Sequence, residues 1–190
     1  MRCVEMKLFF PKNKNQVFIF VACLFVFSLQ ANQANAHDKW IVLGNTGWVS
    51  GDERLTLTMP SVLHPDLRVT SSAAEDLQWI DMQVPFTLGE TIKGIYLCYK
   101  TPSEGSFISQ IRLAEYLIPG TATVHHDDPT DLVSSEGSCY LSPVNNYRPG
   151  GSVNLSLRLN FANAGDRIDL GALGVLIGSL DEDDDDHDDD

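Results

Sequence analysis

The sequence predicts an all-β protein, a single antiparallel β-sandwich or jelly-roll-like domain. Beyond residue 37, no long stretch has the 3.6-residue apolar period of an amphipathic helix. Short runs rich in β-branched and aromatic residues recur instead, separated by turns that contain Gly, Pro, Asn and Asp. One run, Val153 to Phe161, alternates between apolar and polar residues, as a strand with one solvated face does. Many short strands at such spacing are typical of a sandwich.

The runs give eight or nine strands. In chain order they are Lys39 to Leu43, Arg54 to Thr58, Leu77 to Val84, Ile92 to Tyr99, Phe107 to Ile118, Thr121 to His125, Ser138 to Ser142, Val153 to Phe161 and Arg167 to Ile177. The fifth has some helical spacing at Ile108, Ile111 and Glu115. We favour a strand because β-branched and aromatic residues dominate it and Pro119-Gly120 closes it.

Two of the connections between these strands contain strong turn residues. Asn163 to Asp166 separates the last two strands, and Pro102 to Gly105 separates the fourth from the fifth. Such short polar connections favour chain reversal. We therefore expect two antiparallel hairpins, one formed by the last two strands and one by the fourth and fifth.

The first 36 residues have the pattern of a cleaved export signal. Three lysines precede an apolar run from Val17 to Leu29, and Ala34-Asn35-Ala36 offers a small-x-small cleavage site. The run is too short to cross about 30 Å of hydrocarbon, so we expect no permanent membrane span. A lipid attachment at Cys23 is the weaker alternative, because the apolar run continues past it. We expect a protein that is secreted or periplasmic after signal-peptide cleavage.

Residues 37–180 form the predicted sandwich domain, and residues 181–190 form an acidic tail. The tail has nine acidic residues in ten, which predicts a disordered segment that attracts divalent cations only weakly. The domain alone has nine basic and sixteen acidic residues, a net charge of −7. Nucleic-acid binding needs a basic footprint, so this balance argues against a nucleic-acid partner.

Two cysteines, Cys98 and Cys139, remain after the signal. In an exported chain a pair of cysteines most simply forms one disulfide. A bridge between them would close a loop of about 40 residues, which the chain-entropy relation values at about 3–4 kcal/mol.

Cleavage after Ala36 would leave His37 as the first residue. A free α-amine and the imidazole of the same histidine can chelate Cu²⁺ together, and His64, His125 and His126 are candidate partners. This resembles the histidine brace of secreted β-sandwich copper proteins, among them lytic polysaccharide monooxygenases, only in His37 and the all-β body. The alternative is that a histidine merely follows the cleavage site.

The segment Val124 to Leu132 suggests a second metal site. It contains Asp127, Asp128 and Asp131, whose carboxylates could gather on one Ca²⁺. Its adjacent histidines would point to opposite faces of a strand. The simpler interpretation is a turn at Pro129 whose aspartates cap the backbone, because the spacing does not match a DxDxDG calcium loop.

Aromatic side chains raise a third hypothesis, stacking on sugar rings. Trp48 and Tyr147 lie in loops rich in glycine and asparagine, so we expect both to be exposed and to be candidate glycan ligands. Trp40 and Trp79 lie in apolar strands, and we expect them in the core.

No catalytic motif of the GxSxG, HExxH or CxxC type is present. The chain from Ile92 onward resembles a group of uncharacterised bacterial exported proteins to which no activity is assigned. The pieces that carry the resemblance are Ile92-Lys93-Gly94, Leu97-Cys98-Tyr99-Lys100, Ser106 to Gln110, His126-Asp127-Asp128, Thr130-Asp131-Leu132, Cys139-Tyr140 and Leu157 to Phe161. The resemblance implies a stable exported β-domain and no catalytic residue.

The sequence thus favours a non-catalytic protein that binds calcium, a glycan or another partner outside the cytoplasm. The alternative is a copper-binding or copper-oxidase sandwich that uses His37.

Overall fold

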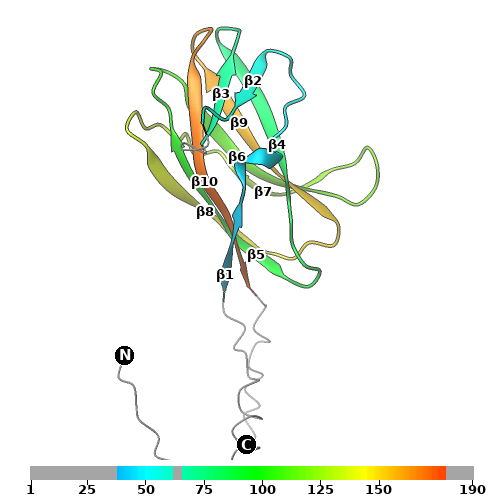
Figure 1. Ribbon diagram of the computed structural model, residues 1–190. Helices are drawn as coiled ribbons and strands as arrows, with labels where there is room; N and C mark the ends of the chain where they lie inside the picture. Colours follow the sequence, from blue (N-terminus) through cyan, green and yellow to red (C-terminus); the bar gives the residue numbers. More distant parts are fainter. Residues whose placement is uncertain (1–37, 62–65, 179–190) are drawn as a thin grey trace, which may run out of the picture. The chain divides into compact units, whose positions relative to one another are not determined.

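The computed structural model describes residues 38–61 and 66–178, which form two antiparallel β-sheets packed face to face (Figure 1). Sheet A contains β2 (Leu55–Thr58), β3 (Leu67–Ser71), β10 (Arg167–Gly178), β5 (Thr91–Lys100) and β8 (Ser138–Tyr147) in that order, with β1 (Lys39–Leu43) also paired to β10. Sheet B contains β4 (Asp76–Val84), β9 (Ser152–Phe161), β6 (Phe107–Tyr116) and β7 (Thr123–Asp128). The predicted all-β sandwich is confirmed.

Strand alternation builds the core between the sheets. The apolar positions of β9 are fully buried, and the inward-facing apolar positions of β5 and β10 on the opposite sheet are buried against them. The β9 set is Val153, Leu155, Leu157, Leu159 and Phe161. Because such positions are close-packed, truncation of one of these leucines to alanine costs about 2–5 kcal/mol.

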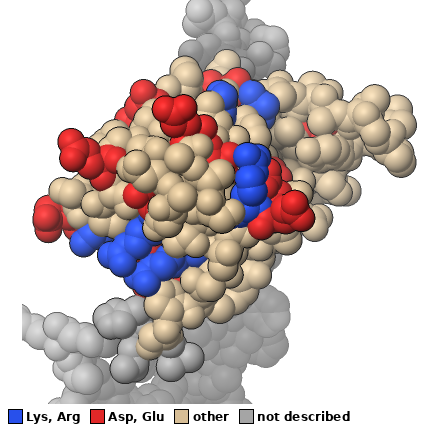
Figure 2. All heavy atoms as spheres, turned by 90° about the horizontal axis from the view of Figure 1, so that it is seen from above, with Lys and Arg blue, Asp and Glu red and all other residues tan. Residues whose placement is uncertain are grey.

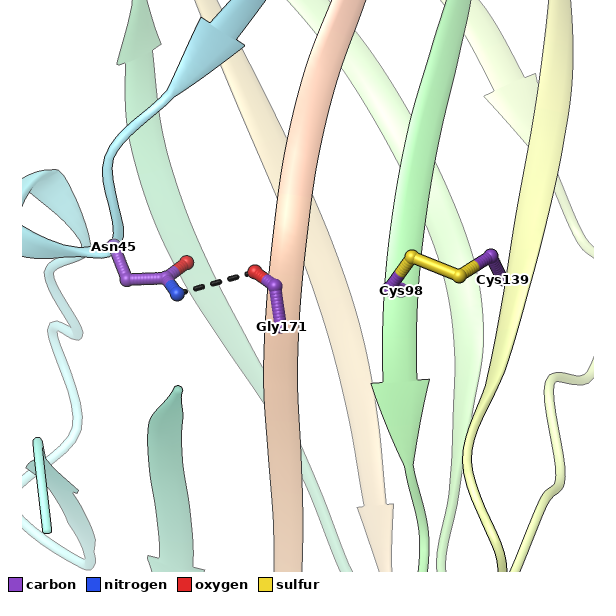
Figure 3. The surroundings of a disulfide bond; sticks show 4 residues. All are labelled: Asn45, Cys98, Cys139 and Gly171. Atoms are coloured by element: carbon purple, nitrogen blue, oxygen red, sulfur yellow. Dashed lines mark hydrogen bonds between the residues drawn. A yellow bond between two sulfur atoms is a disulfide. The ribbon is translucent and has the colours of Figure 1, made fainter. Parts of the chain in front are cut away.

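The long strand β10 pairs with two shorter strands, one after the other, along the same edge. β3 pairs with Arg167 to Leu170, and β1 pairs with Leu173 to Ile177. Between them β10 has a register shift, and the Asn45 amide of the short helix η2 (Asn45–Gly47) donates to the carbonyls of Leu170 and Gly171 at 3.4 and 3.1 Å (Figure 3). This side chain supplies the hydrogen bonds that neither neighbouring strand reaches.

Both predicted hairpins are wrong. β5 lies in sheet A and β6 in sheet B, and β9 and β10 are likewise divided between the sheets. The connections at residues 102–105 and 163–166 therefore cross over the end of the core instead of joining neighbours. Turn residues indicate that the chain reverses, but the apolar face of each strand is buried equally well in either sheet.

The predicted strands themselves agree with the structure, including the one over Phe107 to Tyr116 for which a helix was the alternative. One strand was missed: β3, whose residues follow a segment without clear periodicity. β8 is longer than predicted and continues through Pro143 to Tyr147.

The disulfide between Cys98 and Cys139 is confirmed (Figure 3). The two cysteines lie directly opposite each other on β5 and β8, with 3.9 Å between their Cα atoms and 41 positions between them in sequence. The bond therefore joins neighbouring strands of sheet A on the outer face of that sheet, and does not join the two sheets.

Several predictions fall outside the described residues: the signal peptide (residues 1–36), His37, His64 and the acidic tail (residues 181–190). Within residues 38–61 and 66–178, no helix is long and apolar enough to cross a membrane.

Candidate functional site

The predicted metal ligands of β7 are divided between the two faces of sheet B. In the pairing with β6, Leu113 faces His126 whereas Ala114 faces Val124, so His125 is an extra, bulged residue. A bulge places two consecutive side chains on one side of the sheet. Both imidazoles consequently reach β8 at the open edge between the sheets, and the expectation that they point to opposite faces is wrong.

His126 belongs to a chain of polar contacts that closes this edge. Its Nε2 lies 2.8 Å from Ser142 Oγ on β8, and Ser142 donates to Asp128 on β7 at 2.5 Å. Tyr140 also donates to Asp128, at 3.0 Å. Burial raises the pKa of the Asp128 carboxyl, but the donors around it outweigh burial and the net pKa is lowered. Burial lowers the pKa of His126.

This arrangement is not a nucleophilic triad, although a serine, a histidine and an aspartate meet in it. Ser142 stands between the other two, and its proton is directed at Asp128. In such a triad the histidine lies between the serine and the carboxylate and accepts the serine proton. The cluster therefore joins the edge strands of the two sheets and does not activate the serine.

His125 is exposed at the edge of β7 and contacts a second group, whose other members, Glu115 and Tyr147, are buried. Its Nε2 is 3.0 Å from Glu115 Oε2, and its ring stacks on Tyr147 with centroids 4.1 Å apart. The Gly150 amide donates to Glu115 at 2.6 Å. Burial raises the pKa of Glu115, but the hydrogen bonds lower it further, and burial together with Glu115 raises the pKa of Tyr147.

Asp127 and Asp131 do not join Asp128. Asp127 lies on the outer face of sheet B, where it pairs with Arg112 at 3.2 Å, and Asp131 is exposed in the loop after β7. Within residues 38–61 and 66–178, no three His, Cys, Asp or Glu side chains are grouped so that they could hold a metal ion. The calcium and copper assignments stay predictions, the latter because His37 lies outside the described residues.

The exposure predicted for three aromatic residues is wrong: two that were expected to be exposed are buried, and one that was expected in the core is exposed. Trp48 is 7% exposed and Tyr147 is 8% exposed, so neither offers a ring to a ligand. Trp40, predicted to lie in the core, is 46% exposed. β1 alternates with Ile41 and Leu43 facing inward, which turns Trp40 and Val42 to the outer face of sheet A.

Trp40 borders a groove on that outer face. Its ring meets Tyr96 of β5 edge-to-face, with centroids 5.8 Å apart. The Trp40 groove has a volume of about 290 Å³ and is lined by Trp40, Val42, Tyr96, Ala172, Leu173 and Gly174. A Cβ at Gly174 would lie 3.3 Å from the Trp40 ring, so a glycine here lets the indole lie close to β10.

A second groove follows on the same face. The disulfide groove has a volume of about 370 Å³ and is lined by Asp66, Cys98, Tyr99, Lys100, Gly137, Ser138, Cys139, Asp169 and Gly171. Of its charged residues, Asp169 is paired with Arg68 at 3.0 Å and with Arg167 at 3.5 Å. Lys100 and Asp66 form no ion pair within the described chain.

The outer face of sheet B, in contrast, is occupied by contacts among its own side chains. The Arg112 guanidinium lies 4.7 Å from the centre of the Trp79 ring and also pairs with Asp127. Gln110 donates to Asp127, and Ser156 donates to Asp81. Figure 2 shows a further mixture, acidic and basic side chains lying close together on the face seen from above.

No protein-family model matches this chain, and no curated protein matches it. Solved structures of carbohydrate-binding modules do match its fold. The CBM22-1 xylan-binding domain from Paenibacillus barcinonensis Xyn10C is 12% identical, with a TM-score of 0.50 over 76% of this chain and 96% of that domain. The family 11 carbohydrate-binding module from Clostridium thermocellum, in complex with a β-1,3-1,4-mixed-linked tetrasaccharide, is 17% identical, with a TM-score of 0.49 over 74% and 96%. These likenesses show the fold alone, an antiparallel β-sandwich similar to those of carbohydrate-binding modules.

Proposed function

We propose that this protein is a non-catalytic glycan-binding protein, and that the Trp40 groove is its binding site. The observation that carries the proposal is the exposure of Trp40: 46% of an indole is left in water on a strand, next to Tyr96 and above a groove of about 290 Å³. Burying such a ring against another apolar surface is favourable, and an exposed apolar patch marks a binding surface.

The fold supports the same proposal. Distantly similar sandwiches include a xylan-binding domain, and the groove here is bordered by aromatic rings that can lie against the C–H face of a sugar. On the outer face of sheet B, polar side chains pair with one another around its tryptophan. Trp79, its tryptophan, is covered by Arg112.

Affinity electrophoresis of the protein in gels that contain soluble xylan or mixed-linkage β-glucan tests the proposal, with a glycan array for other sugars. We expect at least one of these neutral glycans to retard or retain the protein. Trp40→Ala should abolish the effect, while Trp79→Ala, which removes the tryptophan of the opposite face, should leave it intact. Circular dichroism checks that both variants fold. Failure to bind every glycan tested, or binding that survives Trp40→Ala, would contradict the proposal.

We also propose that the protein is exported, that residues 1–36 are removed, and that the domain extends over residues 37–180 before the acidic tail of residues 181–190. The disulfide supports an oxidising compartment, and the sequence resemblance to exported proteins agrees with it. The intact mass of the protein recovered from the producing cells tests cleavage: a chain that begins at His37 is expected, and an uncleaved chain in the cytosol would contradict export.

A further inference from the structure

The Trp40 groove and the disulfide groove are next to each other along the same two strands. On β5 the outward-facing positions are Tyr96, which lines the first groove, and Cys98 and Lys100, which line the second. On β10, Gly171 of the disulfide groove directly precedes Ala172 of the Trp40 groove. Successive outward positions on a strand are about 7 Å apart, so the grooves adjoin.

We propose that the two grooves form one track that holds an internal stretch of a linear, uncharged polysaccharide. The inference rests on the proposed glycan-binding function and deepens it. On β5 the residues that line the track run from Tyr96 to Lys100, which pairs with Asp169. This span of four residues corresponds to about 13 Å, longer than one sugar ring.

The two ends of the track have different chemistry. The Trp40 end is lined almost entirely by carbon atoms and offers stacking. At the other end Lys100 is a cation and Asp66 an anion, neither held in an ion pair by any residue of 38–61 or 66–178, beside the Ser138 hydroxyl. Lys100 can donate hydrogen bonds and Asp66 can accept them. Sugar hydroxyls do both, so they suit this end of the track better than a ligand that carries a single charge.

The disulfide holds the two ends in register. Cys98 follows Tyr96 by two positions on β5, and its bond to Cys139 fixes β8 against β5 at the point where the two grooves meet. Gly171 packs against this bond: a Cβ at Gly171 would lie 3.5 Å from the Cβ of Cys98. At the middle of the track Gly171 adds no side chain and the disulfide limits movement, so one polysaccharide chain can pass from one groove to the other.

Titration calorimetry with xylo-oligosaccharides and cello-oligosaccharides, from disaccharide to hexasaccharide, tests the inference on the full chain. In the series that binds, affinity should rise at least tenfold from the shortest ligand that binds to the hexasaccharide. Lys100→Ala should weaken hexasaccharide binding several-fold and leave the shortest ligand that binds unchanged, whereas Arg148→Ala, a cation outside both grooves, should change neither. Binding should be indifferent to salt, because the ligand has no charge.

The possible failures are distinguishable. Affinity that depends on Trp40 but not on chain length or Lys100 would overturn the track and leave the proposed function intact. Preferential, salt-sensitive binding of polygalacturonate would overturn the uncharged ligand. If no glycan binds, or if binding survives Trp40→Ala, the proposed function itself is overturned.

Discussion

The outer faces of the two sheets differ more than any other pair of regions in this molecule. On the outer face of sheet B the tryptophan is engaged by its neighbours: Arg112 is stacked on Trp79 and paired with Asp127. Sheet A leaves Trp40 and Val42 exposed beside a groove. The inner faces of both sheets are apolar, so the two sheets differ in their outer faces and not in the core, and we propose that only the face that carries Trp40 binds a glycan.

The largest effect should come from the only bond of the described chain that ties sheet A together covalently. Replacing both cysteines, as in Cys98→Ala with Cys139→Ala, should lower the free energy of unfolding by about 3–4 kcal/mol, because the denatured chain regains the freedom of a 41-position loop. Urea unfolding of the oxidised wild type and the double variant measures this. A loss below about 1 kcal/mol would show that the bond adds nothing to the pairing of β5 and β8.

A smaller loss is expected at the edge where the sheets meet. Ser142→Ala would leave His126 and Asp128 without their shared partner, at a cost of about 1–3 kcal/mol. Ser138→Ala, at an exposed position of the same strand, is the matched control and should cost little. Equal melting temperatures for the two variants would contradict a stabilising role of the Ser142 hydrogen bonds at this edge.

The same edge predicts how stability depends on pH. The pKa of His126 is lowered in the folded state, so below its ordinary value of 6.5 the unfolded chain binds the extra proton. The free energy of unfolding should therefore fall as the pH drops below about 7. His126→Gln should flatten this slope. The lowered pKa values of Asp128 and Glu115 add a further loss only in more acidic solution, as the pH falls toward their folded values.

The smallest effect concerns sheet B. Arg112→Ala removes a cation–π contact and a partly exposed ion pair, each worth about 1 kcal/mol or less, and should not change glycan binding. Thermal unfolding of this variant measures the lost stability, and affinity electrophoresis shows whether the outer face of sheet B takes part in glycan binding. Loss of binding with an intact fold would place the ligand on the outer face of sheet B instead.

The sequence was sufficient to find nearly every strand, because apolar alternation is a local property. In β9, Val153 to Phe161 alternate as a half-buried strand must. Strand partners were not predictable from the turns: residues 163–166 reverse the chain, but whether β10 then pairs with β9 or crosses to the other sheet depends on competition among all strands.

Exposure of the aromatic residues was equally beyond the sequence. Trp40 sits in an apolar strand, as a core residue would, and is exposed because nothing in the described chain covers the outer face of β1. Trp48 sits among glycines, as a loop residue would, and is buried beside the edge of β4, where Val49 pairs with Asp81. The disulfide was predictable because only two cysteines, Cys98 and Cys139, lie beyond residue 37.

The three tryptophans allow the most direct test, because Trp40, Trp79 and Trp48 report on the outer face of sheet A, the outer face of sheet B and the core. Their three indole N–H signals can be followed by NMR during titration with the glycan that retards the protein, and assigned with single substitutions. Our account predicts that the Trp40 signal shifts with saturation while those of Trp48 and Trp79 stay in place. A shift of the Trp79 signal alone would contradict it.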